Sequence, residues 1–453
     1  MEEQMISVID LGTTKIVGLV GEKTPNGYRV IASSEVPSQG VMRGEVVNNQ
    51  SVLNALRPLL KDLEEKTGHP ITDVVVGIAG QHIRCQAASS SKTRSNKLME
   101  ISAQEIDEMR NNMFDSRVNP GEEILHVIPQ SYHVDEYMNI NPVGMFGTSV
   151  EANYRLFIGK TVSTEHTKRC IESADLHLSQ LILEPLASAL AVLKEDEKEL
   201  GVAMVDIGGG TTDLLVYQNN IIRHTAVIPF GGNVITEDIR QGCEVTQRQA
   251  EQMKIQYGSC YADLAPENKA IVIPGIGGRE PREVPFKLLS HIIEARMDEI
   301  MDAVVYEIKQ SGYAGKIPAG IVLTGGGAKL GDLMQFIKYK TGYDTRIACP
   351  AHVELNLDAD ADPVKYACAV GLLMKGFEKE DVTEPQREPE LVDVFNLPKI
   401  PQTENSKASR KASNGSDAKV KAPKPPKPEK DSGFTGGLFD QISRFFNTTD
   451  NKA

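Results

Sequence analysis

Apolar and polar residues follow the same order at two distant places in the chain. At 203–217, an apolar and β-branched run leads to Asp206, three glycines and two threonines, and a second apolar run follows. At 8–19 the order recurs, with Asp10, one glycine and two threonines between two apolar runs. Each pattern predicts two antiparallel strands joined by a tight, polar turn.

Because this hairpin pattern occurs twice, we expect an internal duplication with two lobes. Glycines allow left-handed backbone and let amide N–H groups converge on an anion without interference from side chains. Phosphate is the expected anion, and a cleft between the lobes would then hold a nucleotide. For either hairpin taken alone, a plain tight turn is the alternative interpretation.

The remaining pattern predicts alternating helices and strands, typical of an α/β protein. Between 82 and 159 the chain is polar and mixed, which indicates a small inserted subdomain. Buried apolar runs predict strands at 28–36, 74–79, 124–134, 149–158, 178–183 and 321–324. Helical spacing predicts helices at 51–67, 102–112, 165–174, 184–193, 246–257, 285–311, 330–341 and 363–376, and one that starts at 236.

Composition narrows the class of protein. At 453 residues, with 40% hydrophobic and 25% charged residues, the chain has room for two or more packed units. A net charge of −13 argues against nucleic acid as a partner. Six scattered cysteines without a CxxC pair indicate free thiols in a reducing compartment. The acidic N-terminus and the lack of a long apolar run predict neither a signal peptide nor a spanning helix.

Three further stretches carry candidate chemistry. Glu184 begins a helix, either as a favourable charge at its N-terminus or as a carboxylate that positions water. Glu251 and Lys254 lie one helical turn apart, and a solvated ion pair is the simple interpretation. The glycines at 325–327 follow a buried strand, but Leu330 replaces the last glycine of a dinucleotide fingerprint, so a flat surface beneath a purine base fits better.

The C-terminal part has a different composition. Residues 377–433 pass from acidic to rich in Lys, Pro and Ser, which predicts a disordered linker. At 434–448 we expect an amphipathic helix, whose apolar side chains span an arc of about 120° at helical spacing: Leu438, Phe439, Ile442, Phe445 and Phe446. Docking on the protein's own core is the alternative to membrane binding, but a long linker favours the membrane.

Taken together, the motifs at 10–14, 184–185, 206–213, 251–254 and 325–328 resemble the superfamily of actin, heat-shock chaperones and sugar kinases. Within it, the chain looks most like the FtsA family of bacterial cell-division proteins, through the polar insert, the tail and the lack of a chaperone-type substrate domain. The resemblance implies an actin-like, two-lobed fold with duplicated ribonuclease-H-like subdomains.

The implied organisation has six parts: a first lobe core at 1–81 and 160–200, an inserted α+β subdomain at 82–159, a second lobe core at 201–235 and 319–376, a smaller subdomain at 236–318, the linker at 377–433 and the membrane helix at 434–448.

The resemblance also implies ATP and Mg²⁺ in the cleft. Asp10 and Asp206 would hold hydrated Mg²⁺, which prefers oxygen ligands. Glu184 would lie near the attacking water, and Glu251 and Lys254 would contact ribose and base. Residues expected at the phosphates are Gly12, Thr13, Thr14, Lys15, Gly208, Gly209, Gly210, Thr211 and Thr212, and Gly231 and Gly232, which follow a strand, would also contact the nucleotide; Gly325, Gly326, Gly327 and Ala328 would lie beneath adenine.

The function implied by the resemblance is a tether. ATP would favour assembly of the chain into filaments, and the filaments would anchor the tubulin-like protein FtsZ to the cytoplasmic face of the membrane at the division site, together with other division proteins. The C-terminal peptide of FtsZ would dock at Arg279 and Arg282 and the helix after Pro285. Hydrolysis would be slow at most. The alternatives are a sugar kinase-like phosphotransferase and a shape-determining or pilus-assembly actin homologue.

Overall fold

The computed structural model describes residues 5–25, 27–96, 98–139, 141–275, 277, 280–351, 353–357 and 361–378. The expected membrane helix, Arg279 and all but the first two residues of the expected linker lie outside this part of the chain.

The first lobe is built on a six-stranded sheet. Its order is β11 (His177–Leu183), β6 (Asp73–Ile78), β1 (Met5–Leu11), β2 (Lys15–Thr24), β3 (Gly27–Pro37) and β19 (Val353–Glu354). Strands β1 and β2 form the first predicted hairpin, and β6 runs parallel to β1 on its other side. Helices α1 (Asn49–Thr67) and α3 (Thr161–Glu172) pack their apolar side chains on one face of this sheet.

The second lobe repeats this arrangement. Its sheet has the order β14 (Ile221–Ile228), β13 (Thr212–Gln218), β12 (Val202–Ile207), β17 (Ile321–Thr324) and β18 (Thr345–Ile347). Strands β12 and β13 form the second hairpin, and β17 is parallel to β12, as β6 is to β1. The order β14-β13-β12-β17-β18 therefore matches β3-β2-β1-β6-β11, which confirms the expected duplication.

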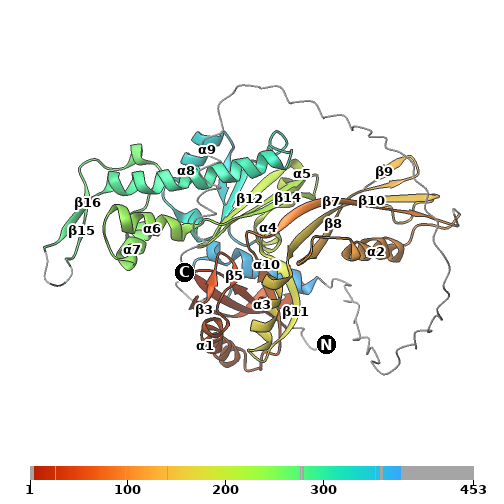
Figure 1. The fold of residues 1–453 in the computed structure, drawn as a ribbon, viewed down its shortest axis with the longest axis horizontal. Helices are drawn as coiled ribbons and strands as arrows, with labels where there is room; N and C mark the ends of the chain where they lie inside the picture. The colour runs from red at the N-terminus through yellow and green to blue at the C-terminus, as the bar shows by residue number, and fades with distance from the viewer. Residues whose placement is uncertain are drawn as a thin grey trace, which may run out of the picture. The chain divides into compact units, whose positions relative to one another are not determined.

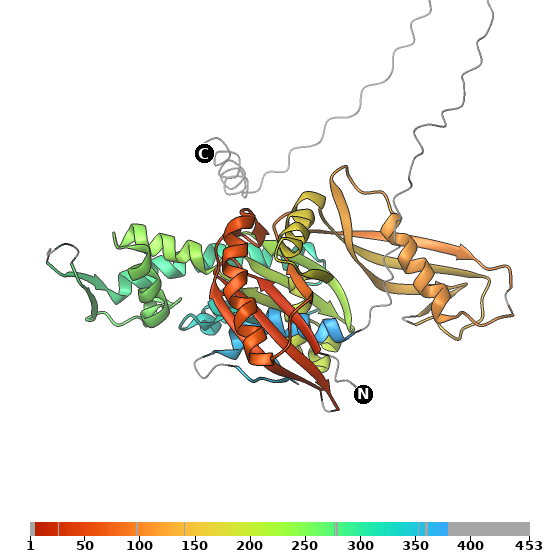
Figure 2. The ribbon, with the colours of Figure 1, turned by 90° about the horizontal axis from the view of Figure 1, so that it is seen from below.

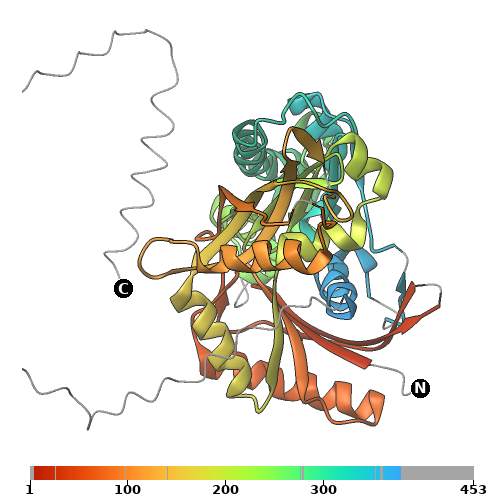
Figure 3. The same ribbon diagram turned by 90° about the vertical axis from the view of Figure 1, so that its right-hand side faces the viewer.

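Two helices lie between the sheets, α4 (Glu184–Val192) and α10 (Ala367–Phe377). Figure 1 shows both helices in this position, and Figure 3 shows α10 in blue. Their side chains form one apolar cluster with residues of both sheets, such as Val8 of β1 and Met204 of β12. The two lobes consequently share a core.

The outer face of the second sheet is covered by α6 (Gly232–Gly242) and α8 (Phe286–Gln310). Also in this lobe are α5 (Glu195–Leu200), α7 (Gln247–Tyr257), α9 (Leu333–Thr341) and the two-stranded sheet of β15 (Ala270–Ile273) and β16 (Arg282–Pro285). Strands β4 (Val41–Met42) and β5 (Glu45–Val46) form a small hairpin in the first lobe.

Several predicted helix boundaries were wrong, and α3 begins at Thr161 rather than at 165. Helix α6 begins at Gly232 rather than at 236, and 3₁₀ turns at Gly326–Lys329 and Pro363–Tyr366 precede α9 and α10. Helix α10 also continues to Phe377, the first residue of the expected linker. Among the described helices, none combines the length and the apolar character needed to cross a bilayer.

The chain between β6 and α3 forms a separate sheet in the order β7 (Arg84–Thr93), β10 (Ser149–Lys160), β8 (Glu122–Val134) and β9 (Tyr137–Asn139). Figure 2 shows α2 (Ala103–Asn111) lying across one face of this sheet. Helix and sheet bury a cluster that includes Ile106, Met109 and Tyr154. This unit therefore has its own small core.

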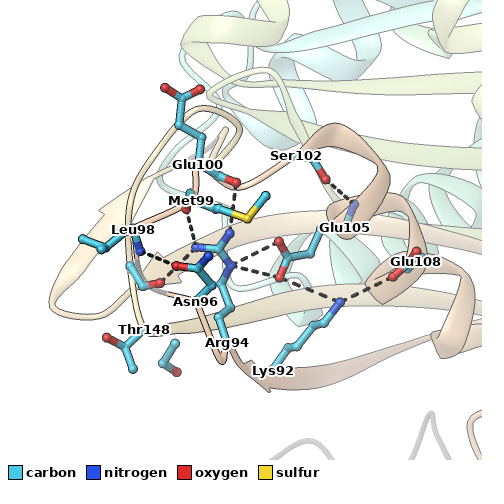
Figure 4. Close-up of polar contacts among 12 residues, drawn as sticks. Lys92, Arg94, Asn96, Leu98, Met99, Glu100, Ser102, Glu105, Glu108 and Thr148 are labelled. Carbon is cyan, nitrogen blue, oxygen red and sulfur yellow. Dashed lines mark hydrogen bonds and ion pairs between the residues drawn. The ribbon is translucent and has the colours of Figure 1, made fainter.

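One arginine, Arg94, binds the two loops of this unit that contain residues 99–100 and residue 147 (Figure 4). Arg94 donates from Nε to both carboxylate oxygens of Glu105 at 3.1 Å. Its Nη atoms donate to the carbonyl oxygens of Met99, Glu100 and Gly147, each at 3.0 Å. The side chain is only 7% exposed. Because a buried guanidinium is costly unless its donors are satisfied, this network fixes both loops relative to α2.

Helices α4 and α10 approach closely enough to exclude a side chain at Gly371. A Cβ added there would lie 1.8 Å from the carbonyl oxygen of Ala187. We expect Gly371→Ala to lower the free energy of unfolding by about 1–3 kcal/mol through overpacking, although alanine favours helix by about 1 kcal/mol. Urea unfolding would measure this change. Gly315→Ala is the control, because no atom lies within 4 Å of its added Cβ; equal stability of the two variants would contradict the prediction.

Candidate functional site

Both hairpin turns border one cavity of about 590 Å³. In each hairpin four residues separate the last paired positions, 12–15 in the first and 208–211 in the second. Helices α4, α6, α7 and α10 and the glycines after β17 complete the wall. Predicted residues that line the cavity are Asp10, Gly12, Thr13, Thr14, Lys15, Glu184, Asp206, Gly208, Gly209, Gly210, Thr211, Gly232, Glu251, Lys254, Gly325, Gly326 and Gly327.

The glycines of the second turn permit contact with the first turn. A Cβ added to Gly209 would lie 1.8 Å from Thr14 Oγ1, and one added to Gly210 would lie 2.4 Å from Thr13 Oγ1. No positive φ occurs at positions 208–210, so the expected left-handed backbone was wrong for this turn. What requires glycine here is the close approach of the two lobes.

At Gly325, by contrast, the backbone does adopt a positive φ of 81°. A Cβ at this position would lie 2.1 Å from Asp206 Oδ1. Any side chain here would therefore disturb both the turn after β17 and the carboxyl group beside it.

Four of the carboxyl groups that line the cavity have raised pKa values: Asp10, Glu184, Asp206 and Asp213. Burial raises the pKa of Asp10 to about 6, aided by Asp206 and opposed by Lys15. Burial, reinforced by the neighbouring acids, raises the pKa values of Glu184 and Asp213 well above their usual range. The pKa of Asp206 is also raised by burial, although the Ser188 hydroxyl donates to its Oδ2 at 2.7 Å.

Asp213 was missed as a site residue. It is 5% exposed, and its Oδ1 has no hydrogen-bond partner. The predicted hairpin contained the signal, because the register pairs Asp213 directly with Asp206 across β12 and β13. Ser188 and Cys368 were also missed, and no local pattern marks them, since they reach the acids from α4 and α10.

Glu251 and Lys254 do not form a solvated surface pair. Lys254 Nζ lies 2.8 Å from Glu251 Oε2 and donates to the Gly232 carbonyl oxygen at 2.9 Å and to Thr236 Oγ1 at 2.7 Å. The lysine side chain is 11% exposed, and burial lowers its pKa. The pair thus ties α7 to the first turn of α6, at the edge of the cavity.

A second lysine faces the cavity from the first turn. Lys15 Nζ lies 2.9 Å from Glu35 Oε2 and 4.0 Å from the centroid of the Tyr366 ring. Its charge opposes the rise in the pKa of Asp10 and of Asp206. Lys15 therefore supplies positive charge next to the acid cluster.

Three predicted contact residues lie behind the cavity wall. Thr212 is fully buried and donates to the Phe230 carbonyl oxygen at 2.8 Å. Gly231 packs on the backbone of the second turn, where an added Cβ would meet the Gly208 carbonyl oxygen at 2.5 Å. Ala328 is fully buried. These residues support the wall and do not line it.

Of the expected partner and membrane residues, the structure describes Arg282. Arg282, at the start of β16, lies 3.1 Å from Glu244 Oε2 and outside the cavity. Arg279 and five residues of the expected membrane helix lie outside the described residues: Leu438, Phe439, Ile442, Phe445 and Phe446.

The donor set fits a hydrated divalent cation. Mg²⁺ prefers carboxylate and water oxygens, and four carboxyl groups with an unpartnered oxygen on Asp213 provide such ligands. The glycines at 325–327 offer a surface without side chains to a flat group. The cavity thus has suitable chemistry for a cation, an anion beside Lys15 and the turns, and an aromatic ring.

Comparison with known proteins gives two matching family models. The model described as cell division protein FtsA matches residues 203–371, and the SHS2 domain inserted in FtsA matches residues 80–158. Among curated relatives, cell division protein FtsA of Pseudomonas aeruginosa is 36% identical over 379 residues, which cover 83% of this chain and 90% of the relative. FtsA of Escherichia coli strain K12 is 33% identical, covering 83% and 91%.

Solved structures confirm the fold class. A PilM-PilN type IV pilus biogenesis complex has a TM-score of 0.59 at 16% identity, covering 83% of this chain and 99% of that chain. MreB5 of Spiroplasma citri bound to ADP has a TM-score of 0.51 at 16% identity, covering 84% and 97%. Together with the family models, they bear out an actin-like fold with an inserted domain.

The carboxyl cluster predicts an unusual pH dependence for the protein without metal or nucleotide. A carboxyl whose folded pKa is raised binds more protons in the folded than in the unfolded state, so its contribution to stability falls as pH rises. For Asp10 this fall lies between about pH 4 and pH 6. Asp213→Asn removes one charge, and we expect it to stabilise the protein at pH 7 by about 1–3 kcal/mol, with a smaller gain at pH 5.

Urea unfolding in EDTA at pH 5, 6 and 7 measures this difference. Glu172→Gln is the control, because Glu172 is exposed at the end of α3. The prediction is contradicted if the difference in free energy of unfolding between the wild type and Asp213→Asn is the same at all three pH values.

Proposed function

This chain belongs to the FtsA family of cell division proteins, and from that premise we propose that it binds ATP with Mg²⁺ in the cavity between its lobes. The observation that carries the proposal is the convergence in one cavity of both glycine and threonine turns, four carboxyl groups and the glycines at 325–327.

In this proposal different residues bind the metal ion, the phosphates, the ribose and the adenine. Asp10 and Asp206 would hold hydrated Mg²⁺, whose charge would offset that of the phosphates and of the carboxyl cluster. Lys15 and the backbone N–H groups of both turns would bind the phosphates. Lys254 and Glu251 would bind the ribose, and the glycines at 325–327 would face the adenine.

Glu184 is the candidate for positioning water. It is the first residue of α4, is 9% exposed and lines the cavity with Asp10. Its raised pKa favours the protonated form until positive charge enters the cluster, so it would accept a proton only in the loaded site. As part of the same proposal, hydrolysis is slow at most and ATP serves mainly to set the conformation of the protein.

The contact between the turns suggests what nucleotide binding would change. Thr13 and Thr14 touch the backbone positions of Gly210 and Gly209 across the cleft, so phosphates held by both turns would alter the distance between the lobes. A ligand shifts an equilibrium by its difference in affinity for two states. We propose that ATP favours the lobe arrangement that assembles into filaments.

Gly326 offers a direct test of nucleotide binding. It lines the cavity, and no atom lies within 4 Å of an added Cβ, so the side chain of Gly326→Val would begin in open space and extend into the volume proposed for the ligand. We expect at least about tenfold weaker binding of Mg-ATP by titration calorimetry, a loss of about 1.4 kcal/mol or more. Gly315→Val is the control, because its position is equally open but outside the cavity. Unchanged affinity in Gly326→Val would refute the adenine site.

The alternatives have less support. The curated relatives named here cover more than four-fifths of the chain and carry the FtsA name. The pilus and MreB5 structures are similar in fold only, at 16% identity. A sugar kinase-like activity would appear as ADP release when candidate polyols are added.

We further propose that residues 434–448 bind the cytoplasmic face of the membrane at the division site. Burial of Leu438, Phe439, Ile442, Phe445 and Phe446 would contribute about 1.5–3 kcal/mol each before the costs of folding and orientation. One helix would bind weakly, whereas a filament would bind tightly through many helices.

Liposome flotation with Mg-ATP tests the anchor. The full chain should float, whereas a chain that ends at Lys430 and a Phe445→Asp, Phe446→Asp variant should remain in solution. A Gln441→Asp, Asn447→Asp variant adds the same charge outside the apolar arc and should still float. If the full chain stays in solution at micromolar concentration, the helix is not a membrane anchor.

The proposed partner is the acidic C-terminal peptide of FtsZ, docked at Arg279, Arg282 and α8. Arg282 is 53% exposed at its side chain and would exchange its ion pair with Glu244 for the peptide. Fluorescence anisotropy of the labelled peptide should show loss of binding in the Arg279→Ala, Arg282→Ala variant. An Arg57→Ala, Arg169→Ala variant removes the same charge from exposed positions of the first lobe and should bind normally. Equal affinities would exclude this docking site.

A further inference from the structure

A thiol lies among the carboxyl groups of the cavity. Cys368 Sγ and carboxylate oxygens of Asp10 and Glu184 all lie within 4.8 Å of one another. Cys368 is 8% exposed and lines the same cavity as the two acids, so an ion that enters the cavity can reach all three.

The packing of α4 against α10 holds this group together. Gly371 of α10 packs against the backbone of Ala187 of α4, and Cys368 and Glu184 each stand three residues before that contact. Asp10 joins them from the end of β1, next to the first turn. The three side chains come from three rigid elements, as a preformed metal site requires.

A second observation points to a ligand at this place. Asp213 lines the same cavity, is 5% exposed and leaves its Oδ1 without a partner. A buried, unpartnered carboxyl oxygen is costly, and a cation or its bound water would satisfy it.

The presence of sulfur selects the class of cation. Magnesium takes oxygen ligands, whereas zinc accepts thiolate, carboxylate and water in one tetrahedral shell. We propose that Asp10, Glu184 and Cys368 form a binding site for a zinc-class, thiophilic divalent cation, with water as the fourth ligand. The Cys368 thiol gives up its proton to solvent as the metal–sulfur bond forms, and no change of oxidation state is involved.

This site shares Asp10 with the expected magnesium site. On the proposed function above, a zinc-class cation bound at Cys368 would therefore exclude Mg-ATP. Magnesium prefers oxygen ligands, so occupation of a site that includes the Cys368 sulfur requires a thiophilic metal.

Cobalt titration of the full, nucleotide-free chain tests the site. Cobalt(II) accepts the same types of ligand as zinc. A cobalt–thiolate bond produces an intense charge-transfer absorption in the near ultraviolet, which bonds from cobalt to oxygen or nitrogen ligands do not produce. We expect this absorption in the wild type, its loss in Cys368→Ser and its retention in Cys349→Ser, which removes the exposed cysteine. Displacement by zinc then gives the zinc affinity, expected to be at least about tenfold weaker in Cys368→Ser.

Three outcomes would overturn the site: no charge-transfer absorption in the wild type, its survival in Cys368→Ser, or its loss in Cys349→Ser. Urea unfolding of both serine variants checks that they fold, and Cys368→Ala replaces Cys368→Ser if the latter does not.

A separate titration tests the exclusion of nucleotide. Micromolar zinc should weaken binding of Mg-ATP to the wild type by at least about tenfold and leave Cys368→Ser nearly unaffected. Unchanged affinity in the wild type would overturn the exclusion. The cobalt result needs no nucleotide, so failure of the proposed ATP site and failure of the metal site remain distinguishable.

Discussion

The contact between α4 and α10 is the constraint on which the rest of the structure depends. Both helices lie between the two sheets, and their side chains belong to one apolar cluster with strands from each lobe. The contact is close because Gly371 has no side chain to hold the helices apart. Since Glu184 and Cys368 stand near the N-termini of these helices, the same packing that joins the lobes also brings catalytic and metal-binding candidates to one end of the cavity.

The cluster of carboxyl groups destabilises the folded protein electrostatically, whereas the packing of α4 on α10 stabilises it. Four of the acids that line the cavity have raised pKa values, because burial opposes the charged form of each and, at Asp10, Glu184 and Asp213, neighbouring acids oppose it further. Such an arrangement loses stability when it is empty at neutral pH and regains it when a cation enters. Binding of the proposed cation would consequently be coupled to the stability of the contact between the lobes.

Contacts also connect the first turn to the base of the inserted unit. Thr13 Oγ1 accepts the Gly44 N–H at 3.2 Å. The next residue is Glu45. Its Oε1 lies 2.8 Å from His82 Nδ1, and its Oε2 accepts a hydrogen bond from the Ser163 hydroxyl at 3.2 Å. His82 is buried immediately before β7, where the inserted unit begins. The turn that would bind phosphate and the inserted sheet are therefore parts of one hydrogen-bonded structure.

The sequence by itself determined both hairpins, most helices and the α/β class, because periodicity and glycine placement are local properties. It also indicated most of the cavity, since residues at equivalent turns of a duplicated fold face one cleft. Only the tertiary structure decided that Cys368 joins Asp10 and Glu184, that Thr212, Gly231 and Ala328 lie behind the wall, and that Lys254 is buried. These outcomes depend on which helix packs against which sheet and how closely, and such long-range contacts leave no periodic signal in the chain.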